Sequence, residues 1–197
     1  GLGFNCAISI LHKENSKFKE SYNIKLPCFV KPNKSGSSFG VQKVKSHENL
    51  HFAIKNALKY DDEAIIEEEI IGKEISCGVF IDKYDNITAL PLTEIISNNE
   101  FFDYKAKYEG ESEEITPAEI NQNLTNKIKK ISIDIYKKMN LRGICRIDFI
   151  LKKENPYIIE INTIPGMSKD SIIPQQIKAA GIKLSEVITM SIQNANI

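Results

Sequence analysis

The stretch that decides the fold is Arg146-Ile147-Asp148-Phe149-Ile150, followed a few residues later by Tyr157-Ile158-Ile159-Glu160-Ile161-Asn162. Both runs read as strands in which acid or amide side chains point one way, while the other, apolar residues face a core. Asp148, Glu160 and Asn162 all offer oxygen ligands. A hard cation such as Mg²⁺ uses these ligands when it also holds substrate phosphates. The two strands therefore suggest nucleotide-dependent chemistry.

The three polar side chains are difficult to explain as ordinary strand residues. For Asp148 alone, a structural salt bridge would be the default explanation. Burying three such groups on neighbouring strands without a cation is costly. Arg146 lies two residues before Asp148, so strand alternation places both on one face. A fixed guanidinium beside a metal site suits stabilisation of an oxyanion or a carboxylate.

Length and composition limit the classes of protein to consider. The 197 residues can form one large domain or two small ones. Hydrophobic content of 42% and charged content of 26% are typical of a globular protein. The formal net charge is zero, so no overall field favours nucleic acid or an acidic membrane. No apolar run is long enough to cross a bilayer. We therefore expect neither nucleic acid nor a membrane as partner.

The four cysteines show no C-x-x-C spacing and lie in apolar surroundings; they are Cys6, Cys28, Cys77 and Cys145. Buried free thiols in a reducing cytoplasm are a better explanation than disulfides or a metal site.

The expected elements mix strands and helices. Before the opening pair we expect strands over residues 4–10, 26–31, 64–68, 74–81 and 88–95, and residues 153–156 form the hairpin of that pair. We expect helices over residues 46–60, from Thr116-Pro117 to about Met139, and over residues 171–180 and 184–195. Adjacent strands joined by short turns are antiparallel. The fold class is therefore α+β and not a doubly wound parallel sheet.

A loop after an apolar strand is a candidate phosphate-binding segment. Lys31-Pro32 ends the strand, and residues 33–40 are small, polar and rich in glycine and serine. Glycines let backbone N–H groups approach anionic oxygens. The loop is not a Walker A motif, because no Gly-Lys-Ser/Thr ends it and no helix follows directly. A plain hairpin turn is the alternative.

Two other segments carry weaker signals. The strand that ends at Glu67 is followed by a bend at Gly72, and such a connection can offer backbone groups to a purine edge; its acids can equally be surface charges. The run Phe102–Tyr108 interleaves aromatics with lysines, as some nucleic-acid sites do. The neutral overall charge favours instead a lid that carries Lys107 onto a phosphate and Tyr108 onto a substrate.

These four segments, taken in chain order, resemble the ATP-grasp superfamily and, within it, the D-alanine–D-alanine ligase family. The resemblance covers nearly the whole chain and is carried by Lys31-Pro32 with residues 35–40, Ile66-Glu67, Gly72, Glu74, residues 102–108, Gly143, residues 146–148, 160–163 and 165–168, and Ser171–Pro174. It implies an α+β ATP-grasp fold of two subdomains with mainly antiparallel sheets, flanking helices and an ATP cleft between them. Residues 1–72 would form the central subdomain and residues 73–197 the C-terminal one.

The resemblance also implies roles for individual residues. ATP would be bound by Lys31, Ser38, Glu67, Ile70, Glu74 and Lys107. Two Mg²⁺ or Mn²⁺ ions would be held by Asp148, Glu160 and Asn162. The tetrahedral oxyanion would be stabilised by Arg146 and the Gly166 amide, with Arg146 also contacting substrate. Ser37 would hydrogen-bond Tyr108, which covers the substrates, and the second D-alanine carboxylate would be fixed by Ser171 and Ile172.

The implied reaction is formation of a carbon–nitrogen bond between two D-alanine molecules for peptidoglycan precursor synthesis in the cytoplasm. ATP would phosphorylate the first carboxylate, and the second amine would attack the acyl phosphate. A D-lactate or D-serine ligase is the nearest rival, although residues 104–108 keep the dipeptide-ligase pattern. A nucleotide-binding module without catalysis is another rival, against which Arg146, Lys107 and the metal residues speak.

One departure from the family pattern matters. The family carries an N-terminal α/β domain before this region, with a Glu that orients the first D-alanine, and a Lys just before Gly1 that helps hold ATP. Neither is in this chain. We therefore expect the chain to be a fragment with little activity alone, from a parent protein that forms a homodimer.

Overall fold

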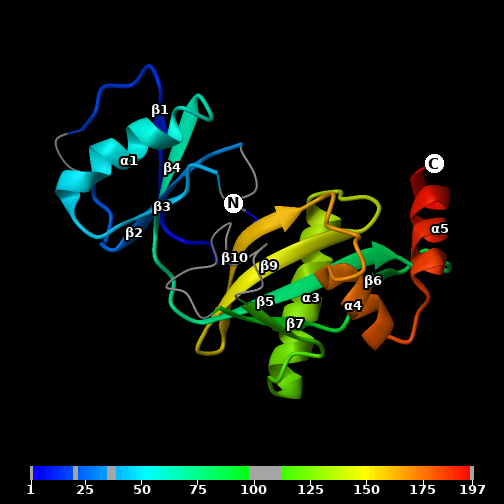
Figure 1. Ribbon diagram of the computed structural model, residues 1–197. Helices are drawn as coiled ribbons and strands as arrows, with labels where there is room; N and C mark the ends of the chain where they lie inside the picture. The colour runs from blue at the N-terminus through cyan, green and yellow to red at the C-terminus, as the bar shows by residue number, and fades with distance from the viewer. Residues whose placement is uncertain (1, 20–21, 35–38, 98–111, 196–197) are drawn as a thin grey trace. The chain divides into compact units, whose positions relative to one another are not determined.

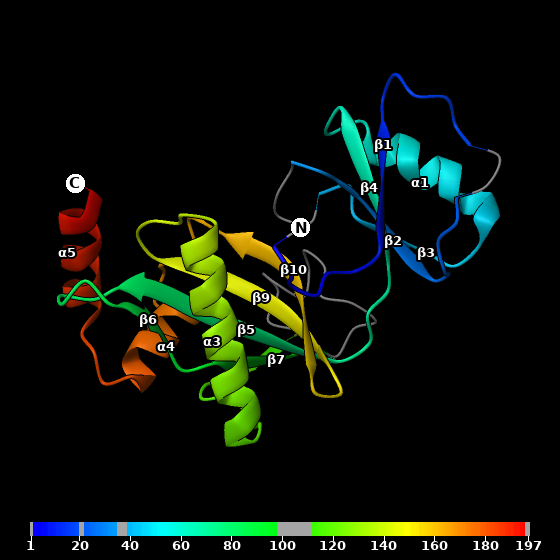
Figure 2. The same ribbon diagram turned by 180° about the vertical axis from the view of Figure 1, so that it is seen from behind.

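The computed structural model describes residues 2–19, 22–34, 39–97 and 112–195 of the chain. Their contacts divide them into two compact units, shown from opposite sides in Figures 1 and 2. The larger unit contains Ile71–Ile96 and Glu113–Ile197 together with the N-terminal segment up to Cys6, and the smaller unit contains Ala7–Ile70. The assignment of residues 1–72 and 73–197 to two ATP-grasp subdomains stays a prediction.

The larger unit is built on an antiparallel sheet in the order β10-β9-β5-β7-β8, with β6 paired to β5. Its strands are β5 (Lys73–Ile81), β6 (Ile87–Ala89), β7 (Thr93–Ser97), β8 (Ser112–Ile115), β9 (Cys145–Lys152) and β10 (Asn155–Asn162). Its helices are α3 (Gln122–Lys138), α4 (Ile172–Ala179) and α5 (Leu184–Ala195). Figures 1 and 2 show α3 on one face of the sheet and α4 on the other. No helix in the described ranges is long and apolar enough to span a bilayer.

Strand alternation explains why the sheet packs on both faces. On the α3 side, alternate residues such as Ile75, Cys77, Ile147 and Phe149 are buried against Ile135 and other helix residues. On the α4 side, a smaller cluster joins Phe80 and Leu90 to Ile173, Ile177 and Val187. The polar residues between them on β5 and β9 therefore lie on the α4 side of a largely buried sheet.

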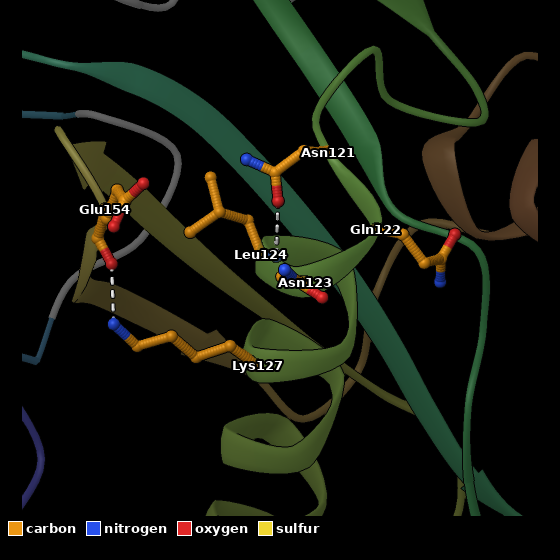
Figure 3. Close-up of a pocket in the computed structure, with 6 residues that line it drawn as sticks. All are labelled: Asn121, Gln122, Asn123, Leu124, Lys127 and Glu154. Atoms are coloured by element: carbon orange, nitrogen blue, oxygen red, sulfur yellow. Dashed lines mark hydrogen bonds between the residues drawn. The ribbon is translucent and has the colours of Figure 1, made fainter.

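The helix expected to open at Thr116-Pro117 begins six residues later, so that prediction is wrong. The Ala118 N–H donates to the Leu92 carbonyl, which holds this segment beside the sheet and keeps it out of a helix. The true N-cap is Asn121, whose side chain accepts a hydrogen bond from the Leu124 N–H at 2.9 Å (Figure 3). A tertiary contact thus overrides the local signal of the proline.

Two expected strands also differ from the structure. The strand over residues 88–95 is divided into β6 and β7, because Pro91 has no N–H for the ladder. The structure has no continuous strand over residues 4–10. Cys6 makes one isolated bridge to Ile158, and β1 begins only at Ser9, where it pairs with another sheet. Cys6 is exposed, which corrects the expectation of four buried thiols; the other three are buried and free.

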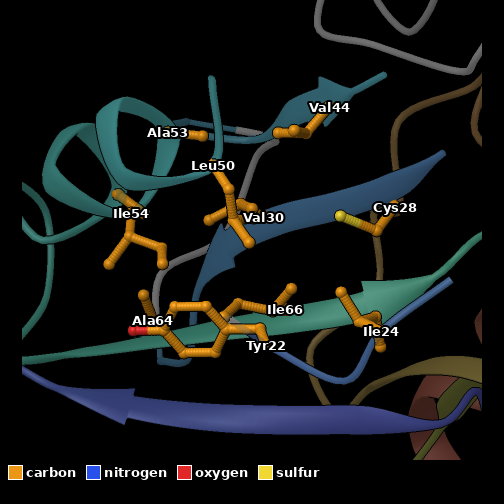
Figure 4. Close-up of a cluster of buried hydrophobic side chains, with 11 residues drawn as sticks. Tyr22, Ile24, Cys28, Val30, Val44, Leu50, Ala53, Ile54, Ala64 and Ile66 are labelled. Atoms are coloured by element: carbon orange, nitrogen blue, oxygen red, sulfur yellow. The ribbon is translucent and has the colours of Figure 1, made fainter. Parts of the chain in front are cut away.

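The smaller unit is a four-stranded antiparallel sheet in the order β1-β4-β2-β3, covered by one helix. Its elements are β1 (Ser9–Lys13), β2 (Cys28–Pro32), β3 (Gln42–Val44), the 3₁₀ turn η1 (His47–Asn49), α1 (Leu50–Ala57) and β4 (Glu63–Glu68). Figure 4 shows Leu50 and Ile54 of α1 directed toward Val30 and Ile66 of the sheet. The α+β class expected from the sequence is confirmed.

The pattern of alternation sends charged residues to the opposite face of the smaller sheet. Val30 and Ile66 are fully buried under α1, while Lys31 and Glu67 are one residue further along each strand and partly exposed. One face therefore supplies the core and the other presents charge.

Candidate active site

Four polar side chains converge where β9 and β10 pair. Asp148 lies directly opposite Glu160, and Arg146 lies directly opposite Asn162. Directly opposed residues of antiparallel strands project to the same side of the sheet. The structure thus brings together the three predicted metal ligands and the predicted oxyanion-stabilising arginine.

A β-bulge produces this register. The pairing shifts between Ile158, which opposes Phe149, and Glu160. If the upstream register continued, Ile159 would oppose Asp148, and Glu160 would oppose the core residue Ile147. The bulge makes Ile159 the extra residue, 38% exposed. The expectation that every apolar residue of this strand faces a core is therefore wrong for Ile159.

Asp148 is buried and fully engaged. Its relative exposure is 4%. Arg146 donates to it through Nε at 2.9 Å and through the terminal nitrogen at 2.8 Å. The Asn162 amide donates at 2.9 Å and the Ser76 hydroxyl at 2.6 Å. Burial of a carboxylate is tolerated because each of its oxygens has charged or polar donors.

Arg146 keeps its charge in this environment. Burial by itself would lower the pKa of Arg146, but attraction and hydrogen bonding to Asp148 raise it, and Glu160 and Glu74 raise it further. Glu160 lies 3.9 Å from the guanidinium, and its side chain is 45% exposed. One guanidinium therefore serves a buried carboxylate on one side and an accessible one on the other.

The cluster fits an oxygen-liganded cation by the chemistry of its donors. In the described ranges no group of three or more His, Cys, Asp or Glu residues is placed to hold a metal. The cluster instead has two carboxylates and an amide. The Asn162 amide nitrogen reaches both Asp148, at 2.9 Å, and Glu160, at 3.3 Å. A half-turn of that amide would present its oxygen to the same carboxylates. The metal assignment stays a prediction.

The loop before α4 brings two predicted substrate-site residues together. Ser171 is the N-cap of α4, and its side chain makes no capping hydrogen bond. Gly166 lies so close that a Cβ there would be 2.9 Å from the Ser171 hydroxyl oxygen. The neighbouring Ile172 is buried in the core around α4. The helix start presents backbone N–H groups that suit a carboxylate.

In the smaller unit, two residues predicted to bind ATP form an ion pair. Lys31 Nζ lies 2.7 Å from a Glu67 carboxylate oxygen, and the side chains are 24% and 23% exposed. Phe29 opposes Glu67, so Lys31 is its diagonal neighbour across β2 and β4. Ile70, also assigned to ATP, is partly buried just after β4. Sequence reasoning gave Lys31 and Glu67 separate roles and missed their pairing.

Four assigned residues lie outside the described part of the chain: Ser37, Ser38, Lys107 and Tyr108. Glu74 is described, and its carboxylate acts on Arg146 through charge. Sequence reasoning overlooked two residues that the structure places near the cluster. Ser76 lies two residues beyond Glu74, so alternation could have placed it on the same face. Glu114 accepts a hydrogen bond from Gln175; burial raises its pKa, while that hydrogen bond and the charge of Arg146 lower it.

An open hollow of about 320 Å³ beside the start of α3 contains none of the assigned residues (Figure 3). It is lined by Asn121, Gln122, Asn123, Leu124, Lys127 and Glu154. Lys127 closes one side of it by donating to the Glu154 carbonyl at 2.6 Å. The polar cluster on β9 and β10 remains the better candidate for chemistry.

Comparison with solved structures identifies the fold. A D-alanine–D-alanine ligase from Bacillus anthracis superposes with a TM-score of 0.83 at 32% identity, over 98% of this chain and 63% of that one. The VanG D-Ala:D-Ser ligase from Enterococcus faecalis gives a TM-score of 0.79 at 29% identity, over 98% of this chain and 57% of that one. The expected ATP-grasp fold is confirmed.

Comparison with curated proteins identifies relatives. The chain is 47% identical to a D-alanine–D-alanine ligase of Flavobacterium johnsoniae over 97% of this chain and 60% of that protein. It is 51% identical to one of Christiangramia forsetii over 86% of this chain and 52% of that protein. The chain thus spans between about half and three-fifths of these relatives. Because residues 4–193 match its family model, the chain belongs to the family described as D-ala D-ala ligase C-terminus.

Proposed function

We propose that the protein carrying this chain uses ATP to join two D-alanine molecules. The observation that carries the proposal is the Arg146 guanidinium held beside two carboxylates and an amide on one face of β9 and β10. Membership of the family and relatives that are themselves D-alanine–D-alanine ligases support it.

In the proposed reaction, a carboxylate oxygen of the first D-alanine attacks the γ-phosphorus of ATP, and ADP leaves. The amine of the second D-alanine then attacks the carbonyl carbon, and phosphate leaves. Arg146, which stays charged beside Asp148, would stabilise the oxyanion together with the Gly166 amide. Ser171 and Ile172 would hold the carboxylate of the second D-alanine, and Tyr108 would cover the substrates, locked by Ser37.

The remaining assignments complete the proposal. Two bound Mg²⁺ or Mn²⁺ ions would neutralise phosphate charge during transfer, and Asp148, Glu160 and Asn162 would hold them. ATP would contact Lys31, Ser38, Glu67, Ile70, Glu74 and Lys107. We also propose a cytoplasmic location, because Cys28, Cys77 and Cys145 are buried free thiols of a kind that persists in reducing compartments.

The test measures phosphate release from ATP by the purified gene product that carries this chain, with Mg²⁺ present. D-Alanine, D-alanine with D-lactate, D-alanine with D-serine, or no amino acid is added, and products are identified by mass. We expect D-alanine to stimulate release and to yield the dipeptide. The D-serine arm is included because VanG, a D-Ala:D-Ser ligase, has a similar fold. Release that no D-amino acid stimulates would overturn the proposal.

A further inference from the structure

A buried serine on the neighbouring strand holds the innermost carboxylate of the site. Ser76 on β5 lies directly opposite Asp148 on β9 and has no exposed surface. Its hydroxyl donates to Asp148 Oδ1 at 2.6 Å. Neither the motifs of the family resemblance nor the proposed reaction assigns a role to Ser76.

The donors around Asp148 are divided between its two oxygens. Oδ1 accepts from Ser76 and from Arg146 Nε at 2.9 Å, and the same Nε reaches Oδ2 at 3.1 Å. Oδ2 accepts from the terminal guanidinium nitrogen of Arg146 at 2.8 Å and from the Asn162 amide at 2.9 Å. Asn162 is itself one of the assigned ligands. The oxygen that faces the other ligands is therefore Oδ2, and Ser76 anchors the opposite oxygen.

The backbone that carries this serine is itself held by helix α4, which packs on the same face of the sheet. The Ser76 carbonyl accepts a hydrogen bond at 3.0 Å from the side chain of Gln176, which is fully buried on α4. The same Gln176 side chain accepts from the Gly78 N–H at 2.9 Å. Helix α4 thus fixes β5 on both sides of Cys77, and the Ser76 hydroxyl has little freedom to move.

We propose that Ser76 is a positioning residue of the metal site, whose hydroxyl fixes Asp148 Oδ1 so that Oδ2 is presented to the cation. The inference rests on the proposed metal assignment. Hydrogen bonds that orient a ligating carboxylate reduce the reorganisation needed on binding, and their loss typically weakens metal affinity about 10–100-fold. A merely structural serine would change stability and leave metal affinity unchanged.

The experiment titrates Mn²⁺ into the gene product that carries this chain, with ADP present, and follows free Mn²⁺ by electron paramagnetic resonance. Ser76→Ala is compared with Ser132→Ala. Ser132 is equally buried, but it lies on α3 and donates to the Ile128 carbonyl at 2.9 Å. We expect Ser76→Ala to weaken Mn²⁺ binding about tenfold or more. Ser132→Ala should bind Mn²⁺ as the wild type does, with thermal unfolding recorded for both.

A second substitution covers the case in which Ser76→Ala does not fold. Ser76→Cys keeps the approximate size but offers only a weak S–H donor, and it should also weaken Mn²⁺ binding. Wild-type Mn²⁺ affinity in the folded Ser76 variants would overturn the inference and leave the proposed function standing. Failure of the wild type to bind Mn²⁺ would overturn both the metal assignment and the inference.

Discussion

Individual carboxylates of the site have different surroundings. Asp148 is 4% exposed and receives hydrogen bonds from Arg146, Asn162 and Ser76. Glu160 has a side chain that is 45% exposed and lies 3.9 Å from the guanidinium. Asp148 is therefore tied to the fold, while Glu160 can respond to a ligand.

Glu160→Gln should separate function from stability. Loss of one negative ligand should reduce metal-dependent turnover by about two orders of magnitude or more. Because the side chain is half exposed, the free energy of unfolding should change by about 0.5 kcal/mol or less. Steady-state kinetics against Mn²⁺ concentration and urea unfolding measure the two effects. Glu154→Gln, an exposed change in the same hairpin, is the control, and unchanged turnover in Glu160→Gln would refute the assignment.

His12 makes the smaller unit sensitive to pH. His12 is 3% exposed, stacks on Phe18 at 4.8 Å and shares a 2.8 Å hydrogen bond with the Tyr22 hydroxyl. Burial lowers the pKa of His12, and the nearby charges of His51 and Lys19 lower it further. The folded state therefore resists a proton that the unfolded chain accepts.

The sign of the effect follows from linkage. The stability contributed by neutral His12 is fully present above the unfolded pKa of 6.5 and is lost as pH falls toward and through the lowered folded value. Urea unfolding at pH 7.5 and 5.5 should show lower stability at pH 5.5. His12→Gln should reduce the difference, whereas the exposed His47→Gln should not. Equal pH dependence in His12→Gln and the wild type would contradict this account.

Among the elements, the contact between α4 and β5 has the clearest energetic role. Gln176 lies at the point where β5 changes partner from β7 to β6. Its side chain bonds the Ser76 carbonyl, the Gly78 N–H and the Thr93 hydroxyl. Gly78 must be glycine here, because a Cβ would lie 2.7 Å from Gln176, Ile173 and Leu90. The side chain replaces ladder hydrogen bonds that neither strand provides.

Gln176→Leu should therefore be strongly destabilising, although the two side chains have similar volumes. Two buried backbone groups would lose their partner, which costs roughly 2–4 kcal/mol. Gln122→Ala on the exposed start of α3 should cost about 0.5 kcal/mol or less. Differential scanning calorimetry would compare the two variants. A Gln176→Leu variant as stable as the wild type would show that water or another side chain replaces the amide.

Local sequence patterns predicted those strands and helices whose position depends on their own residues and not on tertiary contacts. Helix α5 and the β9–β10 hairpin match because alternation and helical spacing agree with their packing. The predicted start of α3 was wrong because the Ala118 N–H donates a hydrogen bond to the Leu92 carbonyl. Local propensity carries no information about this long-range contact. The early strand was wrong because Cys6 and Ser9 pair with different sheets.

For the whole molecule, the site also combines features that follow from local sequence with features that depend on tertiary contacts. Alternation, a local property of each strand, placed Arg146 with Asp148 and Glu160 with Asn162, but the bulge at Ile159, which the spacing does not reveal, puts the two pairs on one face. Ser76 comes from a strand some seventy residues earlier, and only the β5–β9 register places it beside Asp148. No single-sequence pattern specifies that register.

The thiols report on the folding of both units at once. Cys28 lies in the smaller core, where burial raises its pKa, and burial raises the pKa of Cys77 and Cys145 to about 11. Cys6 is exposed. A thiol reagent such as DTNB at pH 8 should therefore react quickly with one group in the native protein and with four in urea.

Cys6→Ser is the matched control for this titration. It should abolish the rapid reaction and leave three thiols that react only after unfolding. More than one rapid thiol in the wild type would mean that one of the two cores opens readily.

The bulge at Ile159 has a consequence for changes in chain length. Deletions inside a strand usually reverse the facing of every residue that follows. Here deletion of Ile159 would restore regular pairing and keep Glu160 opposite Asp148. Deletion of Ile161 would instead turn Asn162 toward the core under α3. Related sequences can therefore lack a residue at position 159 and still present the same ligands. A residue missing at position 161 would instead remove the Asn162 ligand from the site.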